Sequence, residues 1–136
     1  MAKFSMSADL KTSADSVWKM IGGFNALPDW HPAIEKSELE EEGQVRRLAL
    51  AGGGTVIEKL VSTDDGSRTY SYTIVDSPLP ISDYIATIKV TGEGDDCTVE
   101  WSSEFEPAGA SLEDATAVVR GVYEAGLENL KKLYGG

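Results

Sequence analysis

The segment YIATIKVTGEGDDCTVEWSSEFE, residues 84–106, alternates in polarity on both sides of a turn rich in glycine and aspartate. Alternation with a period of two is typical of a β-strand with one buried face, because successive side chains point to opposite faces of a sheet. The turn between the two halves predicts an antiparallel hairpin. The residues that we expect on its buried face are Tyr84, Ala86, Ile88, Val90, Val99, Trp101, Ser103 and Phe105.

Strand patterns continue upstream of this hairpin. Met1–Thr12 alternates, and four more short segments are separated by turns that contain Gly, Asp or Pro. Because each segment lies within hairpin reach of the next, they predict an antiparallel meander, and the first strand brings the sheet to seven strands. The four segments are Ile34–Glu42, Val45–Ala51, Thr55–Thr63 and Arg68–Asp76, the last with Tyr70, Tyr72 and Ile74 facing inward.

Three segments have helical signals. Ser13 can cap a short helix that ends at Gly22-Gly23, and two prolines bracket one further turn at residues 28–32. Ser111 begins a helix that reaches about Tyr134 and is roughly 35 Å long. A curled sheet rarely closes against one helix along its whole length, so we expect an α+β cup with an internal cavity. The predicted apolar face of the helix comprises Ala115, Val118, Val119, Val122, Gly126, Leu130 and Leu133, and we interpret Gly121 and Gly126 as leaving room for a ligand or for close packing.

Composition excludes several classes of function. The chain has 136 residues, which predicts a single domain over 1–136, and its net charge of −11 argues against nucleic-acid partners and anionic membrane surfaces. No apolar run approaches a membrane span or a signal peptide, so we expect a cytoplasmic protein. The single cysteine, Cys97, cannot form an internal disulfide, and the single histidine, His31, cannot build a metal site.

Two charged residues share the parity of apolar neighbours on adjacent strands. The parity that points Leu48 inward also points Arg46 inward, and in the next strand the parity of Leu60 carries Glu58 inward. A buried charge is costly unless it is paired, so each inward choice supports the other. Parity alone leaves a second interpretation open, in which the two residues form an exposed ion pair that adds little to stability.

Several segments, in their order and spacing, resemble the START/Bet v 1-like (SRPBCC) superfamily, in particular its polyketide cyclase/dehydrase-like bacterial members. The resemblance covers essentially the whole chain. It implies a helix-grip fold: a seven-stranded antiparallel sheet wrapped around a long C-terminal helix, with two short helices after the first strand and an internal cavity. The segments are SADSVWKMIGGF (13–24), LPDWHPAIEKSEL (27–39), VIEKLVSTDD (56–65), YSYTIV (70–75), SDYIATIKV (82–90) and VEWSSEFEP (99–107).

Two plant branches of this superfamily are similar in detail. The abscisic-acid receptors have a V-R segment, a gate loop, an E-R-L segment and a latch loop in succession. In lachrymatory-factor-synthase-like proteins, an Arg and a Glu at two of these places are the catalytic pair. The resemblance therefore implies that Arg46 and Glu58 face the cavity as catalytic residues. The matching places here are Val45-Arg46, Ala51–Gly54, Glu58–Leu60 and Asp76–Pro80, and we interpret Gly52-Gly53-Gly54 as a mobile hairpin tip over the pocket mouth.

The expected ligand is small and largely apolar or amphipathic: a polyketide, a lipid or an aromatic metabolite. Arg46 can donate hydrogen bonds to a ligand oxygen, and Glu58 in a low dielectric can carry a proton, which suits cyclisation, dehydration or isomerisation without a cofactor. Two alternatives remain: a non-catalytic carrier or sensor of a hydrophobic metabolite, and a module whose loops meet a partner protein. The candidate ligand-binding residues are Trp30, His31, Leu48, Leu60, Tyr72, Leu79, Tyr84, Ala86, Trp101, Ser103, Val122 and Gly126.

Overall fold

The computed structural model describes residues 2–51, 53–92 and 94–135; Met1, Glu93, Gly136 and the first glycine of the triple-glycine turn, Gly52, lie outside the described residues. Seven strands and three α-helices follow one another in the predicted order. They are β1 (Ala2–Leu10), α1 (Ala14–Ile21), α2 (Leu27–Trp30), β2 (Ile34–Glu40), the 3₁₀ turn η1 (Glu41–Gly43), β3 (Val45–Leu50), β4 (Thr55–Asp64), β5 (Thr69–Asp76), β6 (Ile81–Thr91), β7 (Cys97–Pro107) and α3 (Leu112–Tyr134).

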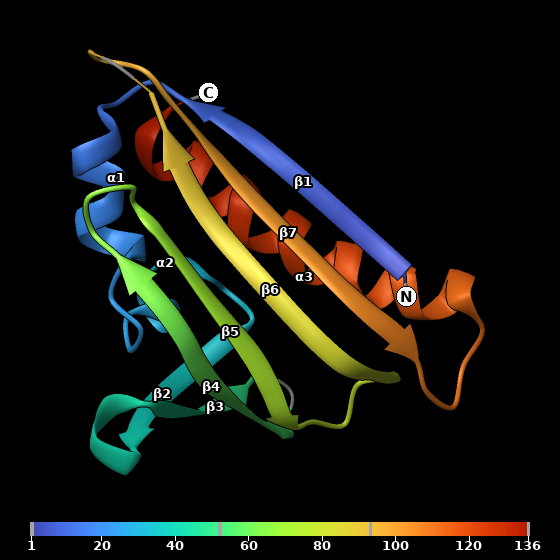
Figure 1. Ribbon diagram of the computed structural model, residues 1–136. Coiled ribbons are helices and arrows are strands. Elements are labelled where there is room, and N and C mark those ends of the chain that lie inside the picture. The colour runs from blue at the N-terminus through green and yellow to red at the C-terminus, as the bar shows by residue number, and fades with distance from the viewer. Residues whose placement is uncertain (1, 52, 93, 136) are drawn as a thin grey trace.

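The strands form one sheet in the order β1-β7-β6-β5-β4-β3-β2, and every neighbouring pair is antiparallel. Strands β2 to β7 are a meander, and β1 joins it beside β7. Figure 1 shows α3 lying along one face of the curved sheet, with α1 and α2 gathered at one end of it. The predicted α+β helix-grip architecture is thereby confirmed.

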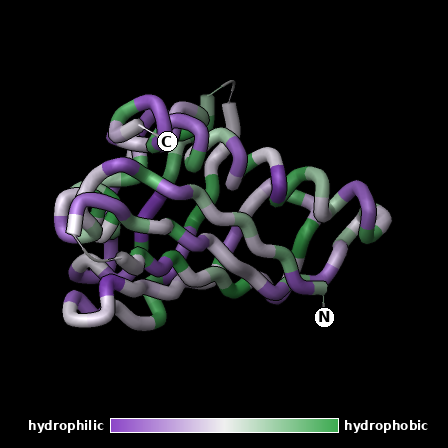
Figure 2. The backbone as a smooth tube through the Cα atoms, turned by 90° about the horizontal axis from the view of Figure 1, so that it is seen from above, coloured by the Kyte–Doolittle hydropathy of each residue, from purple (hydrophilic) through white to green (hydrophobic). Residues whose placement is uncertain are grey.

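Burial along the strands follows the predicted alternation. In Figure 2 hydrophilic and hydrophobic residues interchange along the chain, as expected for a sheet with one covered face. The first strand becomes more buried toward its end, where Ala8 and Leu10 lie in the core. The buried residues of the central strands are Tyr70, Tyr72, Tyr84, Ala86, Ile88, Val90, Val99, Trp101, Ser103 and Phe105.

Helix α3 begins at a side-chain cap, because the Oγ of Ser111 accepts a hydrogen bond from the backbone N–H of Asp114 at 3.1 Å. Its predicted apolar face is wrong at Leu133, which is 50% exposed. That residue lies in the last turn, level with the backbone contact from Lys11 to Gly135 that follows the end of β1. Among the described helices, none is long and apolar enough to cross a membrane. The buried residues of α3 are Ala115, Val119, Tyr123, Gly126, Leu127 and Leu130.

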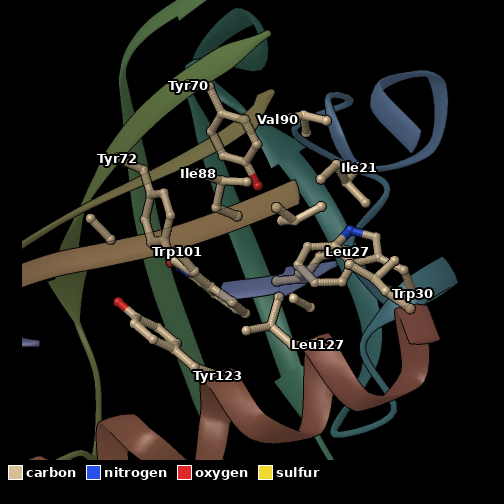
Figure 3. Packing of buried hydrophobic residues seen from close by; sticks show 14 of the residues in the cluster. Ile21, Leu27, Trp30, Tyr70, Tyr72, Ile88, Val90, Trp101, Tyr123 and Leu127 are labelled. Carbon is tan, nitrogen blue, oxygen red and sulfur yellow. The ribbon is translucent and has the colours of Figure 1, made fainter. Parts of the chain in front are cut away.

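Gly126 allows the backbone of α3 to approach the aromatic core closely. A Cβ at this position would lie 2.9 Å from both His31 Cδ2 and Trp30 Cζ3, and 3.1 Å from Trp101 Cζ3. Figure 3 shows Leu127 projecting from α3 into the same cluster of buried rings. Gly121 is different, because a Cβ there would have no described heavy atom within 4 Å. The prediction of close packing therefore applies to Gly126. Gly121 is exposed, so the absence of its side chain makes room neither for a ligand nor for close packing.

Alanine substitutions at these two glycines are expected to change stability in opposite directions. Gly126→Ala forces rigid rings apart and lowers the free energy of unfolding by about 1–3 kcal/mol. Gly121→Ala adds a methyl group in open space and raises it by about 0.5–1 kcal/mol, because alanine favours the helix. Urea unfolding of both variants measures the difference, and equal effects of the two substitutions would contradict the close approach of α3.

Candidate functional site

A cavity of about 190 Å³ lies where α3 crosses the curled part of the sheet. Its wall is mostly apolar and aromatic, as expected for a site that takes small organic molecules. Glu58 and His31 are the most polar groups on it. The lining residues are Leu27, His31, Ala33, Ile34, Leu48, Leu50, Ala51, Val56, Glu58, Tyr72, Ile74, Leu79, Ile81, Tyr84, Trp101, Val119, Val122 and Tyr123.

The structure brings seven of the twelve predicted ligand-binding residues to this wall: His31, Leu48, Tyr72, Leu79, Tyr84, Trp101 and Val122. It places the other five elsewhere. Trp30 and Gly126 pack against each other and against Trp101, outside the cavity. Leu60 faces inward in register with Tyr72 and packs against the core, but it is not among the lining residues. Ala86 and Ser103 are buried partners in register, but their side chains are too short to reach the space.

Ten lining residues were not among the predicted ligand contacts. Alternation gave a usable signal for Val56, Leu50 and Ile74, since each has the inward parity of its strand. The signal for Tyr123 on α3 was weaker, because the predicted apolar face of the helix was defined by its aliphatic residues. Val119 had a helical signal, since it belongs to the predicted apolar face of α3. The other five, from α2, the loops and the ends of strands, had no periodic signal: Leu27, Ala33, Ile34, Ala51 and Ile81.

Arg46 and Glu58 lie directly opposite each other on β3 and β4. Both face inward, with side chains that are 1% and 8% exposed. The Nε atom of Arg46 donates to Oε1 of Glu58 at 2.8 Å, and its Nη2 atom forms an ion pair with the same oxygen at 2.6 Å. The Nη1 atom donates to the backbone carbonyl of Phe24 at 2.8 Å. Of the two arrangements that parity leaves open, the structure has the buried ion pair.

The two partners occupy different positions relative to the cavity. Glu58 lines it, whereas Arg46 lies behind, with its guanidinium 4.2 Å from the ring centroid of Phe24 and 4.9 Å from that of Tyr72. Arg46 is not among the lining residues, and each of its three nitrogens already contacts a protein oxygen, so its expected hydrogen bond to a ligand stays a prediction. Within the described part of the chain, Oε2 of Glu58 receives no hydrogen bond and is the carboxylate atom available to the cavity.

Burial and pairing shift the pKa of each member of this ion pair in opposite directions. Burial raises the pKa of the Glu58 carboxyl, and the Arg46 guanidinium opposes that rise. Burial lowers the pKa of Arg46, but the Glu58 carboxylate and the neighbouring tyrosines outweigh it, so the net shift is upward. Arg46 is therefore a permanent cation, and Glu58 takes up a proton more readily than an exposed carboxylate does.

Aromatic groups with hydroxyl or N–H tips form another part of the cavity wall. The indole Nε1 of Trp101 donates to the Tyr72 hydroxyl at 3.1 Å, and the hydroxyls of Tyr84 and Tyr123 hydrogen-bond to each other at 2.5 Å. The rings of Trp101 and Tyr123 stack with centroids 4.1 Å apart. Burial raises the pKa of all three tyrosines, so their hydroxyls stay protonated at neutral pH and can act as hydrogen-bond donors.

His31 joins the end of α2 to the middle of α3. Its Nδ1 accepts the backbone N–H of Ala33 at 3.1 Å, so the ring proton is on Nε2, which donates to the carbonyl of Val122 at 2.7 Å. The side chain of Asn129 adds a second link, to the carbonyl of Trp30 at 2.9 Å. Burial lowers the pKa of His31, and the backbone hydrogen bonds oppose this only in part. His31 thus holds a neutral ring on the cavity wall.

Two loops meet beside the cavity. Ala51, at the start of the β3–β4 turn, and Leu79, in the β5–β6 loop, both line it. A Cβ on Gly54 would lie 3.8 Å from Cγ of Pro78, so the two loops adjoin. Gly53 and Gly54 have positive φ angles of 106° and 101°, which glycine adopts without strain. The position fits a hairpin tip next to the cavity, and its mobility stays a prediction.

The neutral His31 predicts a loss of stability in mild acid. Its pKa is near 6.5 in the unfolded chain and lower in the folded protein, so the unfolded state binds more protons below about pH 6.5. The contribution of the neutral His31 ring to the free energy of unfolding is therefore fully present above that pH. It decreases as the pH drops toward the folded-state pKa, by up to about 1.4 kcal/mol per pH unit. In His31→Gln this contribution is absent. Urea unfolding at pH 5.5 and 7.5 compares the two proteins, and an identical pH dependence would show that His31 is not held neutral.

The whole chain matches a known protein family. Residues 1–135 match the family described as polyketide cyclase/dehydrase and lipid transport. The comparison with curated proteins gave no match. The two activities in the family description both require that a small ligand be bound, so the match supports ligand binding or cyclase-type activity in general terms.

Solved structures with the same fold extend this result. XoxI from Bacillus cereus is 41% identical, with a TM-score of 0.96 over 98% of this chain and 96% of its own. An uncharacterised protein from Bacillus thuringiensis is 42% identical, with a TM-score of 0.94 over 97% of this chain and 98% of its own. The ZhuI aromatase/cyclase from Streptomyces sp. R1128 shares the fold at 18% identity, with a TM-score of 0.78 over 95% and 90% of the two chains. The chain therefore belongs to the polyketide cyclase/dehydrase and lipid transport family and has its Bet v 1-like (SRPBCC) fold.

Proposed function

We propose that this protein binds a small, largely apolar ligand in the cavity and catalyses a proton transfer on it, without a cofactor. Glu58 is the catalytic base, and Arg46 is a positioning residue. One observation carries the proposal: Oε1 of a buried glutamate is held by a hydrogen bond and an ion pair from Arg46, and its Oε2 is left available to the cavity. A catalytic base must present a fixed lone pair to the substrate, and this arrangement supplies one.

Burial makes the Glu58 carboxylate a stronger base than an exposed one. Its raised pKa brings it closer to neutrality, the range in which a general base both accepts and releases a proton efficiently. Arg46 keeps the carboxylate charged in spite of the apolar surroundings, because its guanidinium is itself buried and cannot lose its proton. Without that cation, a carboxylate in this wall would be held neutral and inactive as a base.

The tyrosines of the cavity wall supply groups that stabilise developing negative charge. In a ketone substrate, Oε2 of Glu58 removes a proton from the carbon next to the carbonyl, and the electron pair of the broken C–H bond moves onto the carbonyl oxygen. A tyrosine hydroxyl from the group Tyr72, Tyr84 and Tyr123 can donate to that oxygen. Return of the proton from Glu58 to a different carbon completes an isomerisation, and the same first step begins a cyclisation or a dehydration.

Isomerisation of 3-cyclohexenone to 2-cyclohexenone, followed by the absorbance of the conjugated product, tests this proposal. The wild-type protein is expected to accelerate the reaction, and Glu58→Gln to lower the rate by about 100-fold or more, because the amide is not a base. The acid limb of the rate lies at a pH above the ordinary carboxyl pKa, since burial shifts Glu58 upward.

The matched control is Glu100→Gln, which changes the same residue type on the exposed side of β7 and leaves the rate unchanged. Equal rates for wild type and Glu58→Gln, with both folded by thermal unfolding, would contradict a catalytic Glu58. Recovery of an unaltered compound from the purified protein by native mass spectrometry, together with no acceleration, would instead support a carrier or sensor.

A further inference from the structure

The size of the cavity limits the ligand. An apolar protein cavity of about 150 Å³ holds one molecule of benzene. The cavity here, at about 190 Å³, therefore has room for one ring with one or two small substituents. A compound of three fused rings would force apart walls that are built from packed aromatic side chains, among them Trp101 and Tyr123, whose rings stack on each other.

The charge on the wall limits the ligand further. Among the described lining residues there is no lysine or arginine, and the nearby guanidinium of Arg46 uses all its nitrogens on Glu58 and Phe24. An anionic ligand would therefore meet the carboxylate of Glu58 with no free cation to compensate it. A cationic ligand would add a buried charge to a pair that is already neutral as a whole. Both cases are costly in an apolar cavity, so the ligand is neutral.

The hydrogen-bonding groups define what the ligand must carry. Both ring nitrogens of His31 are occupied by backbone groups, and the Tyr72 hydroxyl already accepts from Trp101. The strongest acceptor left is Oε2 of Glu58, whose lone pairs lack a partner in the described part of the chain. Among the described side chains, Oε2 is not one of the fully buried polar atoms that lack a partner, so it is accessible on the cavity wall. A ligand that covers it without donating removes its hydration at a cost in free energy, whereas a ligand that donates replaces that hydrogen bond.

We infer that the cavity is selective for neutral single-ring compounds that carry an O–H or N–H donor, such as phenols or the enol forms of cyclic ketones, with the donor bound to Oε2 of Glu58. This inference deepens the proposed function, because it concerns the same cavity and names its substrate class. It narrows the sequence-based expectation of a polyketide, a lipid or an aromatic metabolite to the last of these, because a polyketide or lipid is too large for the space or, with a carboxylate, of the wrong charge.

Isothermal titration calorimetry with four probes tests this selectivity on the wild-type protein. We expect 4-fluorophenol to bind at least 10-fold more tightly than 4-fluoroanisole, which has nearly the same shape but no donor. We expect 4-fluorobenzoate to bind at least 100-fold more weakly than the phenol, and the three-ring compound 9-phenanthrol not to displace it. Equal affinity for the phenol and the ether, preference for the benzoate, displacement by 9-phenanthrol, or no binding of 4-fluorophenol would each overturn the inference.

A double variant locates the selectivity. Arg46→Met/Glu58→Leu removes both charges together, so no unpaired charge is left buried. In this protein the phenol and the ether are expected to bind within threefold of each other, whereas persisting selectivity would overturn the role of Glu58. The control Arg47→Met/Glu40→Leu removes the same residue types from an exposed ion pair of 2.9 Å and keeps the selectivity. Thermal unfolding checks both variants, and the four-probe comparison on the wild-type protein remains decisive if the double variant does not fold.

Different experimental results would contradict the inferred ligand class and the proposed proton transfer. Selective binding of the phenol without isomerisation of 3-cyclohexenone would overturn the proton transfer and leave the ligand class in place. Isomerisation that depends on Glu58, together with tight binding of 9-phenanthrol or of 4-fluorobenzoate, would overturn the ligand class and leave the chemistry in place.

Discussion

A guanidinium is buried directly behind the Glu58 carboxyl of this apolar cavity and favours its charged form against the effect of burial. The antiparallel register of β3 and β4 places Arg46 opposite Glu58, and the carbonyl of Phe24 binds the remaining side of the guanidinium. Rings of Phe24, Tyr70 and Tyr72 surround the cation. The pair thus ties two strands to the segment that follows α1, and the same contacts that make the charges tolerable fix the direction of the one carboxylate oxygen that is available to the cavity.

The cavity exists because α3 is not equally close to the sheet along its length. At Gly126 the missing side chain lets the backbone contact Trp30, His31 and Trp101 directly, and no space remains there. One to two turns earlier, Val119, Val122 and Tyr123 line the cavity. His31 couples the two regions, since its ring contacts the glycine and its Nε2 binds the carbonyl of Val122. The close packing at Gly126 therefore lies directly next to the cavity along α3.

Strand alternation predicted the sheet and its inward faces, because a sheet with one covered face requires a period of two. It left undecided whether the side chains of Arg46 and Glu58 face inward or outward, since either parity of their strands buries apolar residues. The position of Arg46 behind Glu58 was beyond the sequence, because the carbonyl that holds it belongs to Phe24, in an irregular segment without a periodic signal. Leu60 keeps the inward parity of Glu58 and packs against the core, but parity gives only the face of the sheet and not the extent of the cavity along it.

The state of the Glu58 carboxyl is the central claim, and a site-specific NMR titration of its side-chain carbon in the wild-type protein and in Arg46→Met measures it directly. The pKa of Glu58 is expected to lie above that of an ordinary glutamate in the wild-type protein, because of burial, and to rise further when the guanidinium is removed. A pKa at or below the ordinary value, or the same pKa in both proteins, would show that Glu58 is not a buried carboxylate that Arg46 keeps charged.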